Sequence, residues 1–197
     1  MKKSYRYYFA ALLLFSAITG KDAFSETSVP REYIVKAAFL YNFAKFVEWP
    51  ADAFAEIRSP IVLGMLGEDP FGSALDSINH KSVGDREIVI QRLEKLADLK
   101  KCHMLFISRS EKNDLDSILA QLSGLNILTV SDMDGFALKG GIIGLFTVGN
   151  KIRFEINVDS AKRSGLQISS KLLKLAEIVN PSNSGLTESC GFFATLP

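Results

Sequence analysis

The stretch MLFISRSEKNDLDSILAQLSGLNILTV, residues 104–130, decides the fold of this chain. Its apolar start, residues 104–108, predicts a buried strand, residues 111–122 predict a helix that Ser123-Gly124 ends, and residues 127–130 predict a second strand. Residues 61–66 and 87–93 are further strand candidates, and a turn with a short helix separates them. This alternation predicts an α/β layered sandwich with helices on both faces of the sheet.

Two other segments refine this expectation. Residues 142–148 and 151–157 flank the two-residue turn Gly149-Asn150, which predicts an antiparallel hairpin. The sheet is therefore expected to be mixed, mostly parallel, with the hairpin near one edge. Residues 30–49 predict a long aromatic helix that Pro50 ends, and residues from 169 or 170 to 180 predict a last helix with an apolar inner side.

The N-terminus has the pattern of a secretory signal peptide over residues 1–25. Lys2, Lys3 and Arg6 precede an apolar run over residues 7–18, and small residues precede a plausible cleavage site before Glu26. The alternative is a membrane anchor, but a span needs roughly 20 apolar residues and this run is shorter. Residues 26–197 are expected to form a single exported α/β domain, with residues 181–197 as a C-terminal tail.

The balance of charge gives no indication of a nucleic-acid partner. The whole chain has 23 basic and 22 acidic residues and a formal charge of +1. Removal of residues 1–25 would change this charge to about −2, without the basic surplus that nucleic acid or an anionic membrane surface attracts.

Cys102 and Cys190 are the only cysteines. An even number of cysteines in an exported chain favours an internal disulfide bond between them, which would fasten the C-terminal tail to the domain. Two free thiols, or a bond between two chains, are the alternatives, because the sequence does not show how far apart the two Cα atoms lie.

Polar residues follow the predicted strands where a ligand pocket of an open α/β sheet is expected. Asp69, Ser108, Ser131 and Asp132 are the candidate pocket residues. They do not form a recognisable catalytic set, because a serine nucleophile needs a nearby base and acidic residues at strand ends often cap turns and helices. No motif for a metal or cofactor is found. The pattern argues against an enzyme, and an exported hydrolase is the less favoured alternative.

Seven segments in order resemble the YfiR family of periplasmic regulators. They are VKAAFLYNFAKFVEWP (35–50), DPFG (69–72), CHMLFIS (102–108), TVSD (129–132), GGIIG (140–144), RFEIN (153–157) and GLQISSKLLKLA (165–176). The resemblance implies a non-enzymatic α/β protein, usually a homodimer, that represses an inner-membrane diguanylate cyclase by binding its periplasmic sensor domain. It also implies an outer-membrane lipoprotein that sequesters the repressor, so that cyclic di-GMP and biofilm formation rise. A sensor kinase served by a small-molecule-binding module is the alternative.

A repressor of this kind needs an apolar surface with charged edges. The aromatic residues Phe43, Phe46 and Trp49 and the basic residues Lys171 and Lys174 are the candidates for binding the partner. Core packing of the aromatic residues and a merely solvated face for the lysines remain the alternatives.

Overall fold

The computed structural model describes residues 30–56, 58–99 and 101–180. The predicted signal peptide, the C-terminal tail and Cys190 lie outside these residues. The disulfide between Cys102 and Cys190 therefore stays a prediction.

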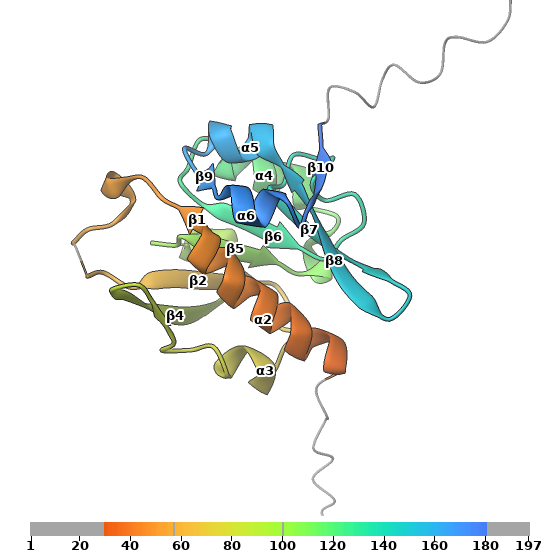
Figure 1. The fold of residues 1–197 in the computed structure, drawn as a ribbon, viewed down its shortest axis with the longest axis horizontal. Helices are drawn as coiled ribbons and strands as arrows, with labels where there is room; N and C mark the ends of the chain where they lie inside the picture. The colour runs from red at the N-terminus through yellow and green to blue at the C-terminus, as the bar shows by residue number, and fades with distance from the viewer. Residues whose placement is uncertain (1–29, 57, 100, 181–197) are drawn as a thin grey trace, which may run out of the picture.

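One mixed sheet of eight strands organises the described chain (Figure 1). From edge to edge its strands are β10 (Glu177–Val179), β8 (Lys151–Asn157), β7 (Ile143–Val148), β6 (Leu128–Ser131), β5 (Met104–Ile107), β2 (Ile61–Leu66), β4 (Arg86–Leu93) and β3 (Ser82–Val83). Only the pairs β7 with β8 and β3 with β4 run antiparallel. The predicted mixed, mostly parallel sheet is confirmed.

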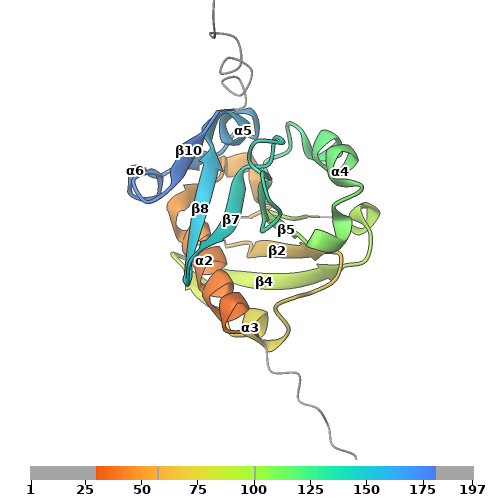
Figure 2. The same cartoon turned by 90° about the vertical axis from the view of Figure 1, so that its right-hand side faces the viewer.

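Helices cover both faces of this sheet, as the sequence predicts. Side chains alternate along β5, so that Met104 and Phe106 join the core under α2 (Arg31–Phe46) and α3 (Ser73–Asp76), while Leu105 and Ile107 pack with α4 (Leu115–Leu122). Figure 2 shows α2 and α4 on opposite sides of the strands. Short 3-10 helices lie at η1 (Ala51–Ala53), η2 (Leu96–Asp98) and η3 (Arg109–Glu111).

The predicted hairpin is confirmed next to one edge. β7 and β8 pair from Ile143 with Ile156 to Val148 with Lys151, and only β10 lies beyond them. Gly149 in the turn has a φ of 60°, which glycine adopts without the steric cost of a Cβ atom. The right-handed twist of the sheet turns β8 steeply against β4 in Figure 2.

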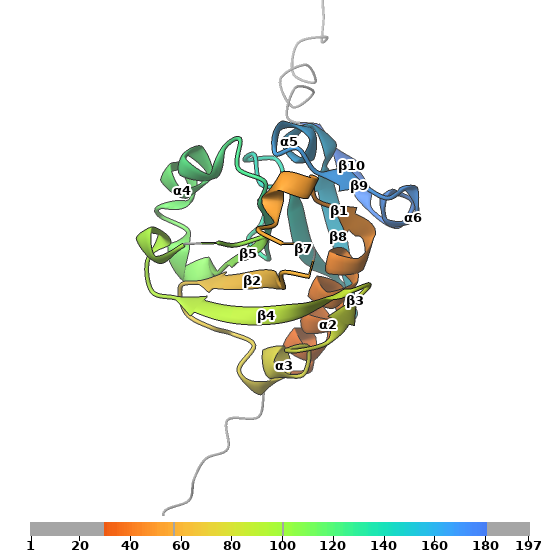
Figure 3. The same ribbon diagram turned by 90° about the vertical axis from the view of Figure 1, so that its left-hand side faces the viewer.

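The first helix is shorter than predicted. It ends at Phe46 because Val47 is extended and pairs with Ile168, so that β1 (Val47–Glu48) and β9 (Gln167–Ile168) form a small antiparallel ladder (Figure 3). Val47 is β-branched and 4% exposed, so the extended pairing buries an apolar side chain that suits a strand.

The prediction of a last helix up to residue 180 was wrong. The helix α6 (Ser170–Leu173) lasts one turn, with Ser169 accepting a hydrogen bond from the Leu172 amide (3.3 Å) at its N-cap. The following segment becomes β10 and pairs in parallel with β8. Its β-branched Ile178 and Val179 favour a strand. The free edge of β8 supplies hydrogen-bond partners for the backbone of this segment, which in a helix would find them within the helix.

Candidate functional site

A cavity lies where the chain changes direction across the sheet. β2 leads through α3 to β4 on one side, whereas β5 leads through α4 to β6 on the other, and these two helices cover opposite faces. Open α/β sheets form a crevice at such a reversal, beyond the carboxyl ends of the strands. A cavity of about 200 Å³ is found there, lined by Tyr33, Glu68, Asp69, Pro70, Ser108, Arg109, Ser110 and Asp132. We call it the switch-point cavity.

Asp132 forms the buried floor of the switch-point cavity. It follows β6 directly and is 1% exposed. Its Oδ2 accepts hydrogen bonds from Nζ of Lys36 (2.5 Å), which is also 1% exposed, and from the hydroxyl of Tyr33 (3.1 Å). Burial and the negative charge of Asp132 raise the pKa of Tyr33 to about 12. The first helix is thereby joined to the end of β6 by charge-assisted contacts.

Arg109 closes the other side of Asp132. Its Nη2 donates to the backbone carbonyl of Asp132 (2.8 Å), and its Nε lies 3.2 Å from Oδ1 of the same residue. The Nε contact is an ion pair without hydrogen-bond geometry. Oδ1 is buried and has no hydrogen-bond partner within the described residues. The side chain of Arg109 is 61% exposed, so its guanidinium also faces solvent. One buried carboxylate oxygen is therefore left without a donor.

Three of the four predicted pocket residues meet at this cavity: Asp69, Ser108 and Asp132. Asp69 has a structural role as well, because its Oδ1 accepts from the amides of Phe71 (2.7 Å) and Gly72 (3.2 Å). Its Oδ2 accepts from Nε of Arg92 (2.8 Å). Turn capping and an ion pair thus account for both oxygens of this carboxylate.

Ser131 does not line the cavity, so its place among the pocket residues was wrong. Its side chain is fully buried, donates to the carbonyl of Ile107 (2.7 Å) and accepts from the amide of Met133 (3.1 Å). Side chains alternate between the two faces of the sheet along β6, so Ser131 points to the face opposite that of Val130, and the pocket position belongs to the next residue.

The two histidines lie away from the cavity. Nδ1 of His103 accepts from the Val62 amide (3.0 Å), and its ring stacks on Phe54 at 4.4 Å between centroids. His80 contacts Glu87 through Nδ1 (3.1 Å). Neither lines the cavity that holds Ser108, so the structure brings no histidine base to that serine.

The candidate pocket residues did not include three residues that contact Asp132: Tyr33, Lys36 and Arg109. Arg109 stands at a predicted strand end and could have been selected on that ground. Tyr33, Lys36 and Leu40 follow one face of the helix at spacings of three and four. A lysine between two apolar residues on a buried helix face indicates a buried acidic partner, and this was the available signal.

The aromatic candidates for binding a partner pack in or against the core. Phe43 is fully buried and packs on Phe154 at 5.2 Å between ring centroids, so its assignment to a contact surface was wrong. Phe46 and Trp49 are partly buried against the same core. Nε1 of Trp49 donates to the carbonyl of His103 (2.9 Å). A helix with a sheet on one side and loops around it needs these rings for packing.

Lys171 and Lys174, in contrast, are exposed on and just after α6. Leu175 is 75% exposed and Ile178 is 47% exposed, although the predicted helix would have turned both inward. These four residues, Lys171, Lys174, Leu175 and Ile178, form what we call the α6–β10 surface. It combines apolar side chains with positive charge at an edge of the sheet.

A family model described as YfiR/HmsC-like matches residues 33–177 of this chain. The chain belongs to the YfiR/HmsC-like family. The resemblance inferred from the seven sequence segments is thus confirmed. The matched range includes every residue that lines the switch-point cavity and ends at the first residue of β10.

Membership of the YfiR/HmsC-like family makes the chain a periplasmic regulator of cyclic di-GMP signalling, in a family of regulatory rather than catalytic proteins. Among the described residues, no helix has the length and apolar character needed to cross a bilayer.

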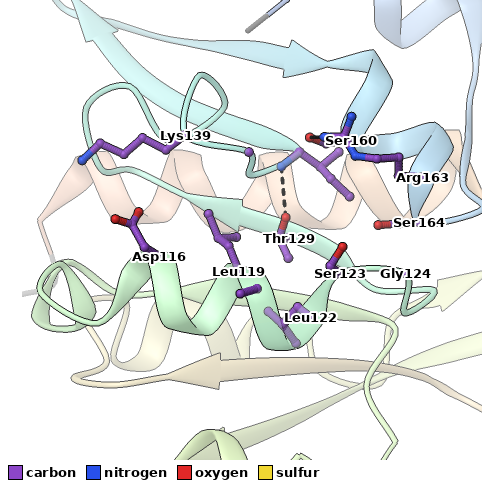
Figure 4. A pocket seen from close by; sticks show the side chains of 13 residues that line it. Asp116, Leu119, Leu122, Ser123, Gly124, Thr129, Lys139, Ser160, Arg163 and Ser164 are labelled. Carbon is purple, nitrogen blue, oxygen red and sulfur yellow. Dashed lines mark hydrogen bonds between the residues drawn. The ribbon is translucent and has the colours of Figure 1, made fainter.

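The YfiR/HmsC-like chain has a second hollow, of about 390 Å³, between α4 and α5 (Val158–Arg163). In Figure 4, Asp116 and Lys139 lie at one end and Arg163 and Ser164 at the other. Thr129, at its base, accepts a hydrogen bond from the Ile142 amide (3.0 Å). Arg163 donates to Ser160 (2.8 Å). These contacts satisfy groups within the hollow, which differs in this respect from the switch-point cavity.

Proposed function

We propose that this chain represses an inner-membrane diguanylate cyclase by binding the periplasmic sensor domain of that enzyme through the α6–β10 surface. The observation that carries the proposal is the exposure of Leu175 and Ile178 in the same short segment as the exposed Lys171 and Lys174. Exposed apolar side chains rimmed by charge are typical of a protein-binding surface.

The position of this surface at the sheet edge supports the proposal. β10 pairs with β8 on one side, and no other described strand pairs with it. The free backbone groups of an edge strand can bind an extended segment of another protein. The two lysines favour an acidic partner surface and would speed the encounter at low ionic strength.

Cellular cyclic di-GMP, with and without this protein, tests the proposal. Deletion should raise the concentration of the dinucleotide, and the original chain should restore it. Leu175→Asp with Ile178→Asp, and separately Lys171→Glu with Lys174→Glu, should fail to restore it while the purified variants unfold at the temperature of the original chain. Leu138→Asp, at a side chain 46% exposed elsewhere, and Lys112→Glu are the matched controls.

Two results would contradict the proposal. If deletion leaves cyclic di-GMP unchanged in cells that express the protein, repression of a cyclase is wrong and a role beside a sensor kinase gains weight. If deletion raises it but the folded surface variants repress normally, the partner binds elsewhere.

The remaining elements of the proposal are a homodimer and an outer-membrane lipoprotein that sequesters the repressor. Light scattering of the purified chain tests the dimer, for which a monomer mass at micromolar concentration would be the contrary result. Release of the cyclase domain from its complex on addition of the soluble lipoprotein domain tests the competition.

A further inference from the structure

We propose that the switch-point cavity binds a small neutral polyhydroxyl compound, such as a polyol or a single monosaccharide. One hydroxyl group of the ligand would donate to Oδ1 of Asp132 and accept from the guanidinium of Arg109. The site would give this regulator an input that is separate from its partner surface.

The first observation behind the proposal is that Oδ1 of Asp132 accepts no hydrogen bond within the described residues. Lys36 and Tyr33 both donate to Oδ2, so Oδ1 is the buried acceptor without a hydrogen bond in the described chain. Buried carboxylate oxygens are rarely left without donors, because their desolvation is then uncompensated. The atom itself is buried but belongs to a residue that lines the cavity, so a small shift of the lining side chains would let a ligand or water in that space supply the donor.

The charges around Oδ1 select a neutral donor. Lys36 and Arg109 both contact Asp132, and Lys36 also forms an ion pair with Glu32, so these four groups together carry no net charge. An added cation would approach the guanidinium of Arg109, which repels it, and an anion would meet the lone pairs of Oδ1. A hydroxyl group avoids both penalties, because it donates to the carboxylate and accepts from the guanidinium.

The rim does not alter this balance greatly. Asp69 is neutralised by Arg92, and Glu68 is exposed to solvent, where its charge is screened. Arg109 has five N–H donors, and its exposure of 61% leaves some of them available to further oxygens of a ligand.

The volume limits the ligand to a small molecule. A space of about 200 Å³ holds roughly six or seven water molecules at their volume in the liquid. A space of this size suits a monosaccharide or a short polyol. Tyr33 and Pro70 supply less polar wall beside the hydroxyl-binding groups.

The position in the fold is an independent observation. The cavity lies at the reversal between β2 and β5, where the connections leave toward opposite faces. Sheets of this kind bind ligands at that place as a consequence of their topology. The larger hollow beside α4 has neither this position nor an orphan buried oxygen among its described groups.

Titration of the purified chain, without any partner protein, with neutral and charged probes tests the proposal. The neutral probes are glycerol, myo-inositol, D-ribose, D-glucose and D-galactose, and the charged probes are ethanolamine and acetate. Two-dimensional amide NMR should show that at least one neutral probe, at millimolar concentration, shifts the amide signals of Ser108, Arg109 and Met133. The charged probes should leave those signals unchanged.

Arg109→Met is the variant that places the ligand. Its side chain is mostly exposed, so the fold should survive, and the dissociation constant of the bound probe should rise about tenfold through loss of its hydrogen bonds. Arg163→Met, in the hollow beside α4, should leave that constant unchanged. Asp132→Asn should also weaken binding, and Arg109→Met keeps the test valid if the asparagine variant does not fold.

The proposal is overturned if no neutral probe shifts these signals, or if only ethanolamine or acetate does. It is also overturned if a neutral probe binds the original chain and Arg109→Met with equal affinity. These outcomes are independent of cyclic di-GMP repression, because no cyclase domain takes part in the titration.

Discussion

Replacement of Lys36 by methionine should destabilise the protein strongly, although it removes a single charge. Lys36 and Asp132 are each 1% exposed, and Nζ of the lysine donates to Oδ2 of the aspartate at 2.5 Å. Methionine would fill much of the space of the lysine stem, so the loss of packing should be small. The remaining cost is that of a buried carboxylate with only Tyr33 and Arg109 near it.

The expected loss in the free energy of unfolding is about 3–5 kcal/mol, the range for breaking a buried pair by removing one partner. The contact of Lys36 with Glu32, whose side chain is 41% exposed, should add little. For a chain of this size the loss corresponds to a fall in Tm of roughly 10 °C. It is also a large share of a total stability that is typically about 5–15 kcal/mol.

Urea unfolding followed by circular dichroism measures the effect in a double-mutant cycle of Lys36→Met, Asp132→Leu and the combination. The combined variant should be more stable than the sum of the two single losses predicts, because it leaves no unpaired buried charge in this pair. Lys45→Met, at an exposed position of the same helix, is the control and should change stability by less than about 0.5 kcal/mol. Additive losses, or a loss for Lys36→Met as small as that for Lys45→Met, would refute the reasoning.

Two further predictions concern residues outside the cavity. Burial lowers the pKa of His103, so the unfolded chain binds more protons than the folded chain below the ordinary histidine pKa of about 6.5, and stability should fall as the pH falls through that value. In thermal unfolding between pH 7.5 and 5, His103→Gln should weaken this dependence, whereas His80→Asn, at a side chain 66% exposed, should keep it. Equal slopes in both variants would contradict the assignment. A Cβ atom on Gly141 would lie 2.1 Å from the buried ring of Phe136, so Gly141→Ala should lower the free energy of unfolding by about 1–3 kcal/mol. Gly135→Asn is the control and should be tolerated in the same urea titration, because Gly135 has a φ of 68° and open space around it. A Gly141→Ala variant as stable as the original chain would show that the ring can move.

Local pattern was sufficient for much of the sheet. The apolar runs that became β2 and β5 are bounded by proline, glycine or polar residues, and the two-residue Gly149-Asn150 turn permitted only a hairpin. The last helix failed for a physical reason. Residues 170–179 have a helical pattern of apolar positions, but the edge of β8 offers backbone hydrogen bonds to the β-branched Ile178 and Val179, and tertiary pairing overrides a weak helical preference.

Only the strand-end residues of the candidate site could be predicted from the sequence, and its helix residues could not. The rule that ligands bind beyond strand ends selected Asp69, Ser108 and Asp132, which do meet at one cavity. It could not supply Tyr33 and Lys36, because they reach Asp132 from a helix almost 100 positions earlier in the chain. It also could not distinguish Ser131 from Asp132, since a shift of one residue along a strand moves a side chain to the opposite face of the sheet.

The small ladder between β1 and β9 has a consequence for how the chain acquires its structure. The helix α2 is synthesised before its partners, since β1 at its end pairs with Ile168 and Phe43 within it packs on Phe154. A ribosome and an export channel both deliver the chain with its N-terminus first, so this helix must wait for its lasting partners until most of the sequence has emerged. Its aromatic rings should lack their core partners during that interval, when a chaperone or a neighbouring chain can bind them. The N-terminal helix therefore becomes stable only when the strands that it packs on and pairs with have formed.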